Sequence, residues 1–134
     1  MQEQFPKILK PFFILVDFGF ILYWLITAFG WIPDEYLFPD YKNATMVIWN
    51  WSFLPLDLFV SATGIYALRL HAKKDARQNQ FAILSLAFTS ASGLQAISFW
   101  MIQGWFDWFW WFPNLFLLIY PIPFLFYFVR NRRL

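Results

Sequence analysis

Four long apolar runs, separated by short charged or turn-forming segments, dominate the sequence. A helix needs about 20 mostly apolar residues to cross about 30 Å of hydrocarbon. The runs at about 11–31, 45–70, 80–103 and 107–129 all reach that length. In lipid only a helix satisfies its own backbone hydrogen bonds within one segment, so each run predicts one transmembrane helix. The connections are short, so sequential helices should pack antiparallel. We therefore expect an all-α membrane protein, one integral domain over residues 1–134 built as an up-down-up-down four-helix transmembrane bundle.

Composition excludes a water-soluble domain. Of the 134 residues, 60% are hydrophobic and 13% are charged, whereas soluble domains carry about 25% charged residues. A cleavable signal peptide does not explain the first run. The apolar h-region of a signal peptide has only about 7 to 15 residues, whereas this run is longer and contains Asp17.

The chain has no cysteine and one histidine, which argues against zinc or haem. We expect no metal, no cofactor and no nucleic-acid partner.

Lysine and arginine predict the orientation. Nine of the ten lie in the N-terminal tail, at 69–77 or in the C-terminal tail, and only Lys42 lies in a loop on the other side. Because cytoplasmic loops carry the excess of basic residues, both termini should be cytoplasmic. Tryptophans near the external ends match an interfacial belt: Trp31, Trp49, Trp51, Trp105, Trp108, Trp110 and Trp111.

Two carboxylates, Asp17 and Asp57, lie inside the apolar runs. Ionised side chains within a span are costly, so they usually face the bundle interior and often mark function. At about 1.5 Å per residue, Asp57 lies about 18 Å from Arg69, near the midplane, and Asp17 about 10 Å beyond Lys10, in the cytoplasmic half. This difference in depth, about 8 Å, argues against a lipid-modifying enzyme that uses both acids.

Helical spacing gathers polar and small residues onto one face of the second run and one face of the third. Small faces allow close helix packing and interhelical hydrogen bonds, so we expect the two faces to meet. Pro55 cannot donate to the carbonyl four residues earlier, which predicts a kink or a local opening there. The faces comprise Asn50, Asp57, Ser61 and Gly64 on the second run and Ser85, Thr89, Ser92 and Ala96 on the third.

Four polar residues are expected at similar depth in the external half, surrounded by aromatic side chains: Asn50, Asp57, Gln95 and Asn114. They would form a cavity that holds a lipophilic cation by charge and cation–π contact, or that exchanges a proton for substrate. Alternatively, these groups and a protonated Asp57 bond one another only to hold the helices in register, which the sequence favours slightly. Asp17 has a structural interpretation too, because it is shallow enough to pair with Lys7, Lys10 or Arg130.

Three strings resemble those of the YvaD-like family of small bacterial membrane proteins: WNWSFLPLD at 49–57, SGLQAISFW at 92–100 and WWFPNLFLL at 110–118. The similarity extends over nearly the whole chain and includes its length and four-span layout. The resemblance implies a bacterial cytoplasmic-membrane protein and supplies no catalytic residue.

Two hypotheses for function follow. In the first, the chain is a non-enzymatic membrane interaction or structural component. It uses the small-residue face of the third run or a lipid-facing aromatic face to associate in the lipid bilayer with a protein partner or a second copy. In the second, it is a small transporter or binder with Asp57 as the counter-charge and Asn50, Gln95 and Asn114 as polar contacts. We expect no conventional enzyme, because the sequence has no phosphate-binding glycine loop, no Ser/His/Asp arrangement and no metal-ligand pair.

Overall fold

A computed structural model describes residues 6–33, 35 and 40–131, and its regular elements are all α-helices. Four helical stretches are long and apolar enough to cross a membrane, which confirms the all-α class and the four expected runs. Two of these stretches are divided into two helices each. The helices are α1 (Leu9–Phe29), α2 (Ala44–Trp51), α3 (Leu54–Ala72), α4 (Gln78–Gln103), α5 (Trp108–Ile119) and α6 (Pro121–Asn131).

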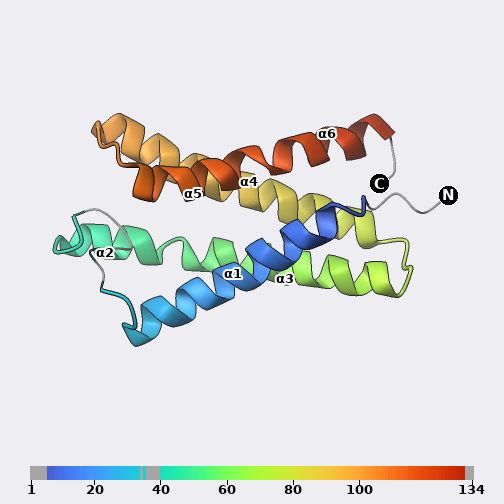
Figure 1. The fold of residues 1–134 in the computed structure, drawn as a ribbon, viewed down its shortest axis with the longest axis horizontal. Helices are drawn as coiled ribbons and strands as arrows, with labels where there is room; N and C mark the ends of the chain where they lie inside the picture. The colour runs from blue at the N-terminus through green and yellow to red at the C-terminus, as the bar shows by residue number, and fades with distance from the viewer. Residues whose placement is uncertain (1–5, 34, 36–39, 132–134) are drawn as a thin grey trace.

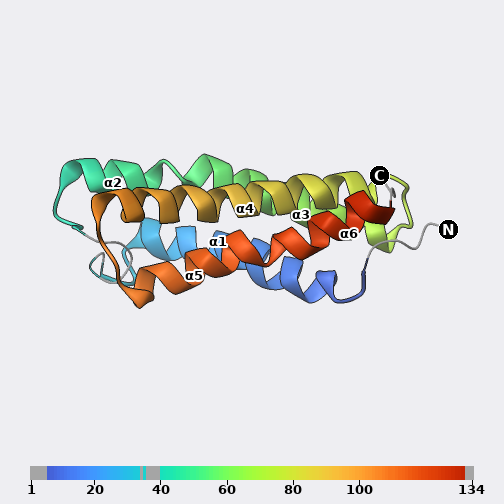
Figure 2. The same cartoon turned by 90° about the horizontal axis from the view of Figure 1, so that it is seen from above.

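The four stretches lie side by side along the long axis of the molecule (Figures 1 and 2). The connection between α3 and α4 lies at the same end as the start of α1 and the end of α6 (Figure 1). Helix α4 is central, since it packs against α3, α5 and α6, while α1 packs against α3. The bundle therefore has one end with α2 and α5 and another with the α3–α4 connection.

Prolines divide both split spans. Helix α2 ends at Trp51 and α3 begins at Leu54, with Pro55 in the first turn of α3, where its missing N–H leaves no intrahelical bond unmade. The opening expected at Pro55 is confirmed. The last span divides in the same way, because α5 ends at Ile119 and α6 begins at Pro121.

Glycines end α1 and α4. Gly30 and Gly104 adopt left-handed φ values of 64° and 79°, which residues with a Cβ adopt only at a cost. In both cases the next residue donates its N–H to the carbonyl five positions earlier, at 3.1 Å after Gly30 and 2.9 Å after Gly104. This Schellman arrangement satisfies carbonyls that the helix end would leave free.

The two polar faces pack against each other inside the bundle. Ser85 Oγ of α4 donates to the carbonyl of Val60 on α3 at 3.0 Å, and both residues are fully buried. The other residues of both faces are buried as well. The expected contact between the faces is therefore confirmed. Apolar packing continues around them through residues with no exposed surface: Leu9, Phe13, Leu86 and Phe128.

An ion pair orders the connection between α3 and α4. Asp75 accepts from the Arg77 backbone N–H at 2.9 Å, from Nε at 3.0 Å and from Nη2 at 2.9 Å. These hydrogen bonds favour the charged carboxylate and lower the pKa of Asp75 from 3.8 to about 2. The local order that they provide is therefore present in full above the ordinary pKa and is lost as the pH falls toward about 2.

We expect the Asp75 carboxyl carbon to titrate near pH 2 by NMR. In Arg77→Ala the midpoint should move up toward the ordinary range, because the hydrogen-bond donors and the positive charge are removed. Asp107→Asn, at the other end of the bundle, is the control and should leave the Asp75 midpoint unchanged. An Arg77→Ala midpoint equal to that of the wild type would contradict this account of the connection.

Gly93 allows α4 and α5 to approach closely. A Cβ at this position would lie 2.5 Å from the carbonyl oxygen of Asn114 and 2.6 Å from the backbone nitrogen of Leu118. These atoms belong to the backbone of α5, so only a separation of the two helices would make room.

Gly93→Ala should therefore destabilise the bundle by about 1–3 kcal/mol, as overpacking does in other proteins. Gly19→Ala is the matched control, because a Cβ at Gly19 meets no atom within 4 Å. It should be neutral, or stabilising by up to about 1 kcal/mol through helix propensity. Thermal unfolding in detergent would compare the two variants, and equal stability would contradict the close approach.

Candidate ligand-binding site

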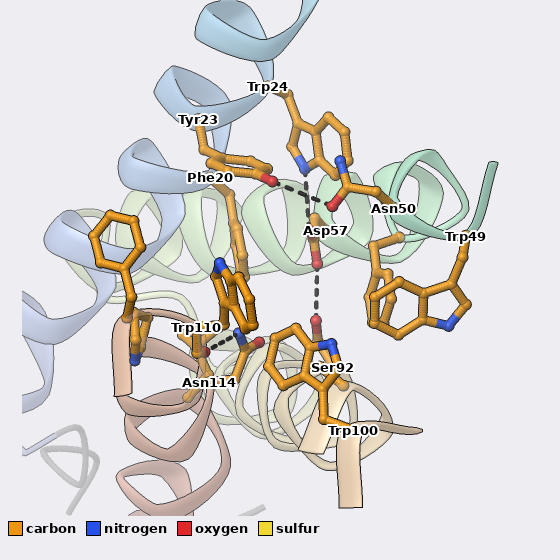
Figure 3. A pocket seen from close by; sticks show the side chains of 15 residues that line it. Phe20, Tyr23, Trp24, Trp49, Asn50, Asp57, Ser92, Trp100, Trp110 and Asn114 are labelled. Atoms are coloured by element: carbon orange, nitrogen blue, oxygen red, sulfur yellow. Dashed lines mark hydrogen bonds between the residues drawn. The ribbon is translucent and has the colours of Figure 1, made fainter. Parts of the chain in front are cut away.

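A cavity of about 360 Å³ lies between the four spans, in the half of the bundle that contains α2 and α5 (Figure 3). Eight of its fifteen lining residues are aromatic. None of the fifteen is basic, and Asp57 is the one acid among them. The lining comprises Phe20, Tyr23 and Trp24 of α1; Trp49, Asn50, Phe53 and Asp57 of the second span; Ser92, Ala96 and Trp100 of α4; and Phe109, Trp110, Pro113, Asn114 and Leu117 of α5.

Asp57 joins three helices through its carboxylate. Its Oδ2 accepts from Trp24 Nε1 of α1 at 3.0 Å, and its Oδ1 accepts from Ser92 Oγ of α4 at 3.0 Å (Figure 3). The residue is 4% exposed. It stands in the first turn of α3, where the partial positive charge of the helix terminus favours an anion. A carboxylate accepts about four hydrogen bonds, so these two donors leave room for a ligand to interact with the same group.

Asn50 and Asn114 lie at the same cavity. The Asn50 carbonyl oxygen accepts from the Tyr23 hydroxyl at 3.3 Å, and Asn114 Nδ2 donates to the Trp110 carbonyl at 3.0 Å (Figure 3). Both amides are therefore oriented by a neighbouring residue. Together with Asp57, they are three of the four polar residues that the sequence places in one cavity.

The structure does not bring Gln95 into this cavity. Gln95 is exposed and borders a second, smaller pocket of about 270 Å³, together with Ser52 and Leu56. Three helical positions separate Gln95 from Ser92, which turns its side chain about 60° away from the face that carries Ser92. The expected depth of Gln95 along α4 agrees with the cavity, but its side chain points from a different face of the helix.

Three buried N–H groups of the cavity lining have no hydrogen-bond partner among the described residues: Asn50 Nδ2, Trp100 Nε1 and Trp110 Nε1. Buried donors are nearly always paired, because leaving one unpaired costs about 1–3 kcal/mol. All three can only donate. The wall therefore presents hydrogen-bond donors to acceptor atoms of a ligand or of water, in addition to the Asp57 carboxylate.

Asp17 lies outside this cavity. It has no exposed surface, and neither carboxylate oxygen has a hydrogen-bond partner within the described part of the chain. The expected pairing with Lys7, Lys10 or Arg130 is not formed by these described residues. Asp17 instead lies between α1 and α3, close to Gly64 and Ser85.

Sequence reasoning missed Trp24, the residue that donates to Asp57. Nine tryptophans are present, and the sequence places seven of them near the ends of the spans, where an interfacial belt is expected. Trp24 and Trp100 are the other two, and both are buried and line the cavity. A buried tryptophan usually pairs its N–H, so the depth of Trp24 was a usable indication of the site.

Comparison with known proteins shows the family of this chain. Residues 9–133 match the "Family of unknown function (DUF5360)". The chain belongs to the DUF5360 family. It is also 43% identical to "Uncharacterized protein YvaD" of Bacillus subtilis (strain 168) over 127 residues, which is 95% of this chain and 96% of that protein. The resemblance to the YvaD-like family is thereby confirmed, and no solved structure matches this DUF5360 chain.

Trp24→Phe should destabilise the bundle, because Asp57 Oδ2 would lose its donor while most of the ring packing stays. An unpaired buried acceptor costs about 1–3 kcal/mol. The matched control is Trp51→Phe, since the Trp51 ring packs on Trp24 with centroids 5.1 Å apart but does not line the cavity. We expect a clear loss of thermal stability in detergent for Trp24→Phe only. Equal loss in both variants would mean that ring packing, and not the hydrogen bond, carries the effect.

Proposed function

We propose that this protein binds a small lipophilic cation in the cavity, with Asp57 as the counter-charge. The observation that carries the proposal is a nearly buried carboxylate on the wall of an aromatic cavity whose lining contains no basic residue. A carboxylate in such a place needs a positive partner. Because the lining supplies none, a cationic ligand is the group that best completes the site.

The aromatic walls favour a cation with apolar substituents. A cation over an aromatic face gains about 0.5–2 kcal/mol per ring, most when water is excluded. The volume of about 360 Å³ lies at the lower end of the range of about 300–1,000 Å³ for ligand pockets. This size favours a compact organic ammonium over a large amphiphile.

Binding or transport, without chemical conversion, is the activity that we propose. The alternative of a purely structural or partner-binding component relied in part on the small-residue face of α4 (Ser85, Thr89, Ser92 and Ala96). These four residues are at most 3% exposed and lie inside the bundle, so this face does not offer a surface to another protein. The geometry therefore favours the ligand hypothesis, which the sequence placed second.

We further propose that the protein lies in the bacterial cell membrane with both termini in the cytoplasm. In the described chain, basic residues gather where α1 begins, α3 meets α4 and α6 ends, while Lys42 lies near α2. Arg132 and Arg133 are outside the described residues. The positive-inside rule supports a cytoplasmic position for the basic end. The cavity would then lie in the external half of the membrane.

Calorimetric titration of the purified protein in lipid nanodiscs with benzyltrimethylammonium tests the proposal. This probe joins one aromatic ring to a compact quaternary ammonium. Asp57→Asn should weaken binding by about tenfold or more, equivalent to about 1.4 kcal/mol or more, because it removes the counter-charge and retains the shape. Asp107→Asn is the matched control, since it removes the same charge from an exposed residue that does not line the cavity.

Binding that is weakened by Asp57→Asn and unchanged by Asp107→Asn supports the site. Trp110→Leu, which keeps the charge and removes one aromatic wall, should bind with intermediate affinity. A wild-type protein that binds no quaternary ammonium, or an Asp57→Asn variant that binds as well as the wild type, would overturn the proposal.

A further inference from the structure

The cavity leaves Asp17 unexplained, although it is the more deeply buried of the two acids. Asp17 is 0% exposed and Asp57 is 4% exposed. The two oxygens of Asp57 both accept a hydrogen bond, whereas neither oxygen of Asp17 does so from any described residue. Asp17 is thus an ionisable group inside the membrane for which the helix packing supplies no partner.

Asp17 belongs to a layer of side chains that repeats the layer around Asp57. We call Trp24, Asp57 and Ser92 the outer layer, because they are joined by the two hydrogen bonds of Asp57. We call Asp17, Gly64 and Ser85 the inner layer, because Asp17 Oδ2 and Ser85 Oγ are among the nearest atoms to a Cβ built at Gly64.

Seven residues separate the two layers on each of the three helices. The shift runs toward the C-terminus on α3 and toward the N-terminus on α1 and α4, which run opposite to α3 (Figure 1). Seven residues correspond to about 10 Å along a helix and to nearly two full turns, so both layers lie on the same helix faces. The acids therefore occupy one continuous interface between α1, α3 and α4. The pairs are Asp17 and Trp24 on α1, Asp57 and Gly64 on α3, and Ser85 and Ser92 on α4.

The inner layer provides space for a carboxyl group but no donor to it. Gly64 contributes no side chain, and a Cβ there would overlap the Asp17 carboxyl group. Ser85 Oγ donates to the Val60 carbonyl at 3.0 Å, and Ser61 Oγ donates to the backbone carbonyl of Asp17 at 2.7 Å. The hydroxyls of Ser61 and Ser85 thus donate to backbone oxygens, and neither donates to the Asp17 carboxyl group.

Few ionisable groups act on Asp17. Its neighbours on α3 are Ser61 and Gly64 and its neighbour on α4 is Ser85, none of which is charged. From the break between α5 and α6, the titratable Tyr120 interacts electrostatically with it. Among the described residues, no basic side chain forms an ion pair with Asp17. The site therefore lacks the cation that would hold a permanent carboxylate.

We propose that the Asp17 carboxyl is a proton-binding site within the transmembrane bundle. The ligand is a proton taken from hydronium, which forms one O–H bond on a carboxylate oxygen and leaves a water molecule. Binding converts an anion that the inner layer does not stabilise into a neutral acid that it accommodates. The reverse step returns the proton to water and restores the anion, so Asp17 exchanges one positive charge with the solvent.

Infrared spectroscopy of the ligand-free protein in nanodiscs tests this site during a pH titration in H₂O and D₂O. The wild type should show a carboxylic-acid C=O band that shifts in D₂O and is replaced by carboxylate bands as the solution becomes alkaline. Asp17→Asn, close in shape to the neutral acid, should lose this band. Asp57→Asn is the matched control, because it removes the other buried carboxyl and should retain the Asp17 band.

Ser85→Ala provides a second variant if Asp17→Asn does not fold. It removes the hydroxyl beside the Asp17 carboxyl and should shift the frequency of the Asp17 band, whereas the same substitution at Ser92, beside Asp57, should leave that band in place. The proposal is overturned if no band depends on Asp17. It is also overturned if the band stays constant throughout the titration and in D₂O, since Asp17 would then be a fixed structural acid.

This test is independent of the proposed function, because no organic cation is present. A protein with a titrating Asp17 band that does not bind benzyltrimethylammonium would retain the proton site and lose the cation site. A protein that binds the cation through Asp57 but has no Asp17 band would show the reverse.

Discussion

The structure depends on satisfying one carboxylate, that of Asp57, inside a bundle of four apolar spans. No described basic side chain pairs with it, and the bundle uses the indole N–H of Trp24 and the hydroxyl of Ser92. These donors belong to different helices, and both hydrogen bonds are made only when α1 and α4 lie on the correct faces of α3. Interhelical hydrogen bonds average about 0.6 kcal/mol in membranes. Their contribution is therefore mainly to specify register, while the packing of small residues supplies contact area.

Small residues and prolines create the geometry around that carboxylate. Gly64 and Gly93 let neighbouring helices and side chains approach α3 and α4 to distances that a Cβ would prevent. Pro55 ends the continuity of the second span, so that Asp57 falls in the first turn of a new helix. A single uninterrupted helix would place the same residue without the favourable field of a helix N-terminus. The cavity is thus a product of backbone interruption and close packing as well as of its lining residues.

Much of this architecture could be predicted from the sequence, because lipid imposes strict rules on length and polarity. The four spans, the break at Pro55 and the buried faces of the second and third runs follow from hydropathy, proline chemistry and helical periodicity. Asn50, Asp57 and Asn114 were also placed correctly at one cavity. Gln95 was not, since depth along a helix is easier to infer than direction around it.

The contribution of α1 could not be inferred in the same way. Its sequence is apolar on nearly every side, so periodicity does not reveal which face meets α3. Trp24 was therefore not recognised as the donor to Asp57, and Asp17 was matched with basic residues near the membrane surface instead of with Gly64. Only the packing of three helices shows that the two acids share one interface.

The break between α2 and α3 fixes the depth of the site. Ser52 and Phe53 form the turn between the two helices and keep right-handed helical backbone angles, and Phe53 lines the cavity. Moving the proline by one turn would move the start of α3 by about 5 Å along the bundle axis. Asp57 would then no longer fall in the first turn of that helix, where the partial positive charge of the terminus favours its carboxylate. The position of Pro55 in the sequence therefore sets where the first turn of α3, and with it the Asp57 site, lies along the bundle axis.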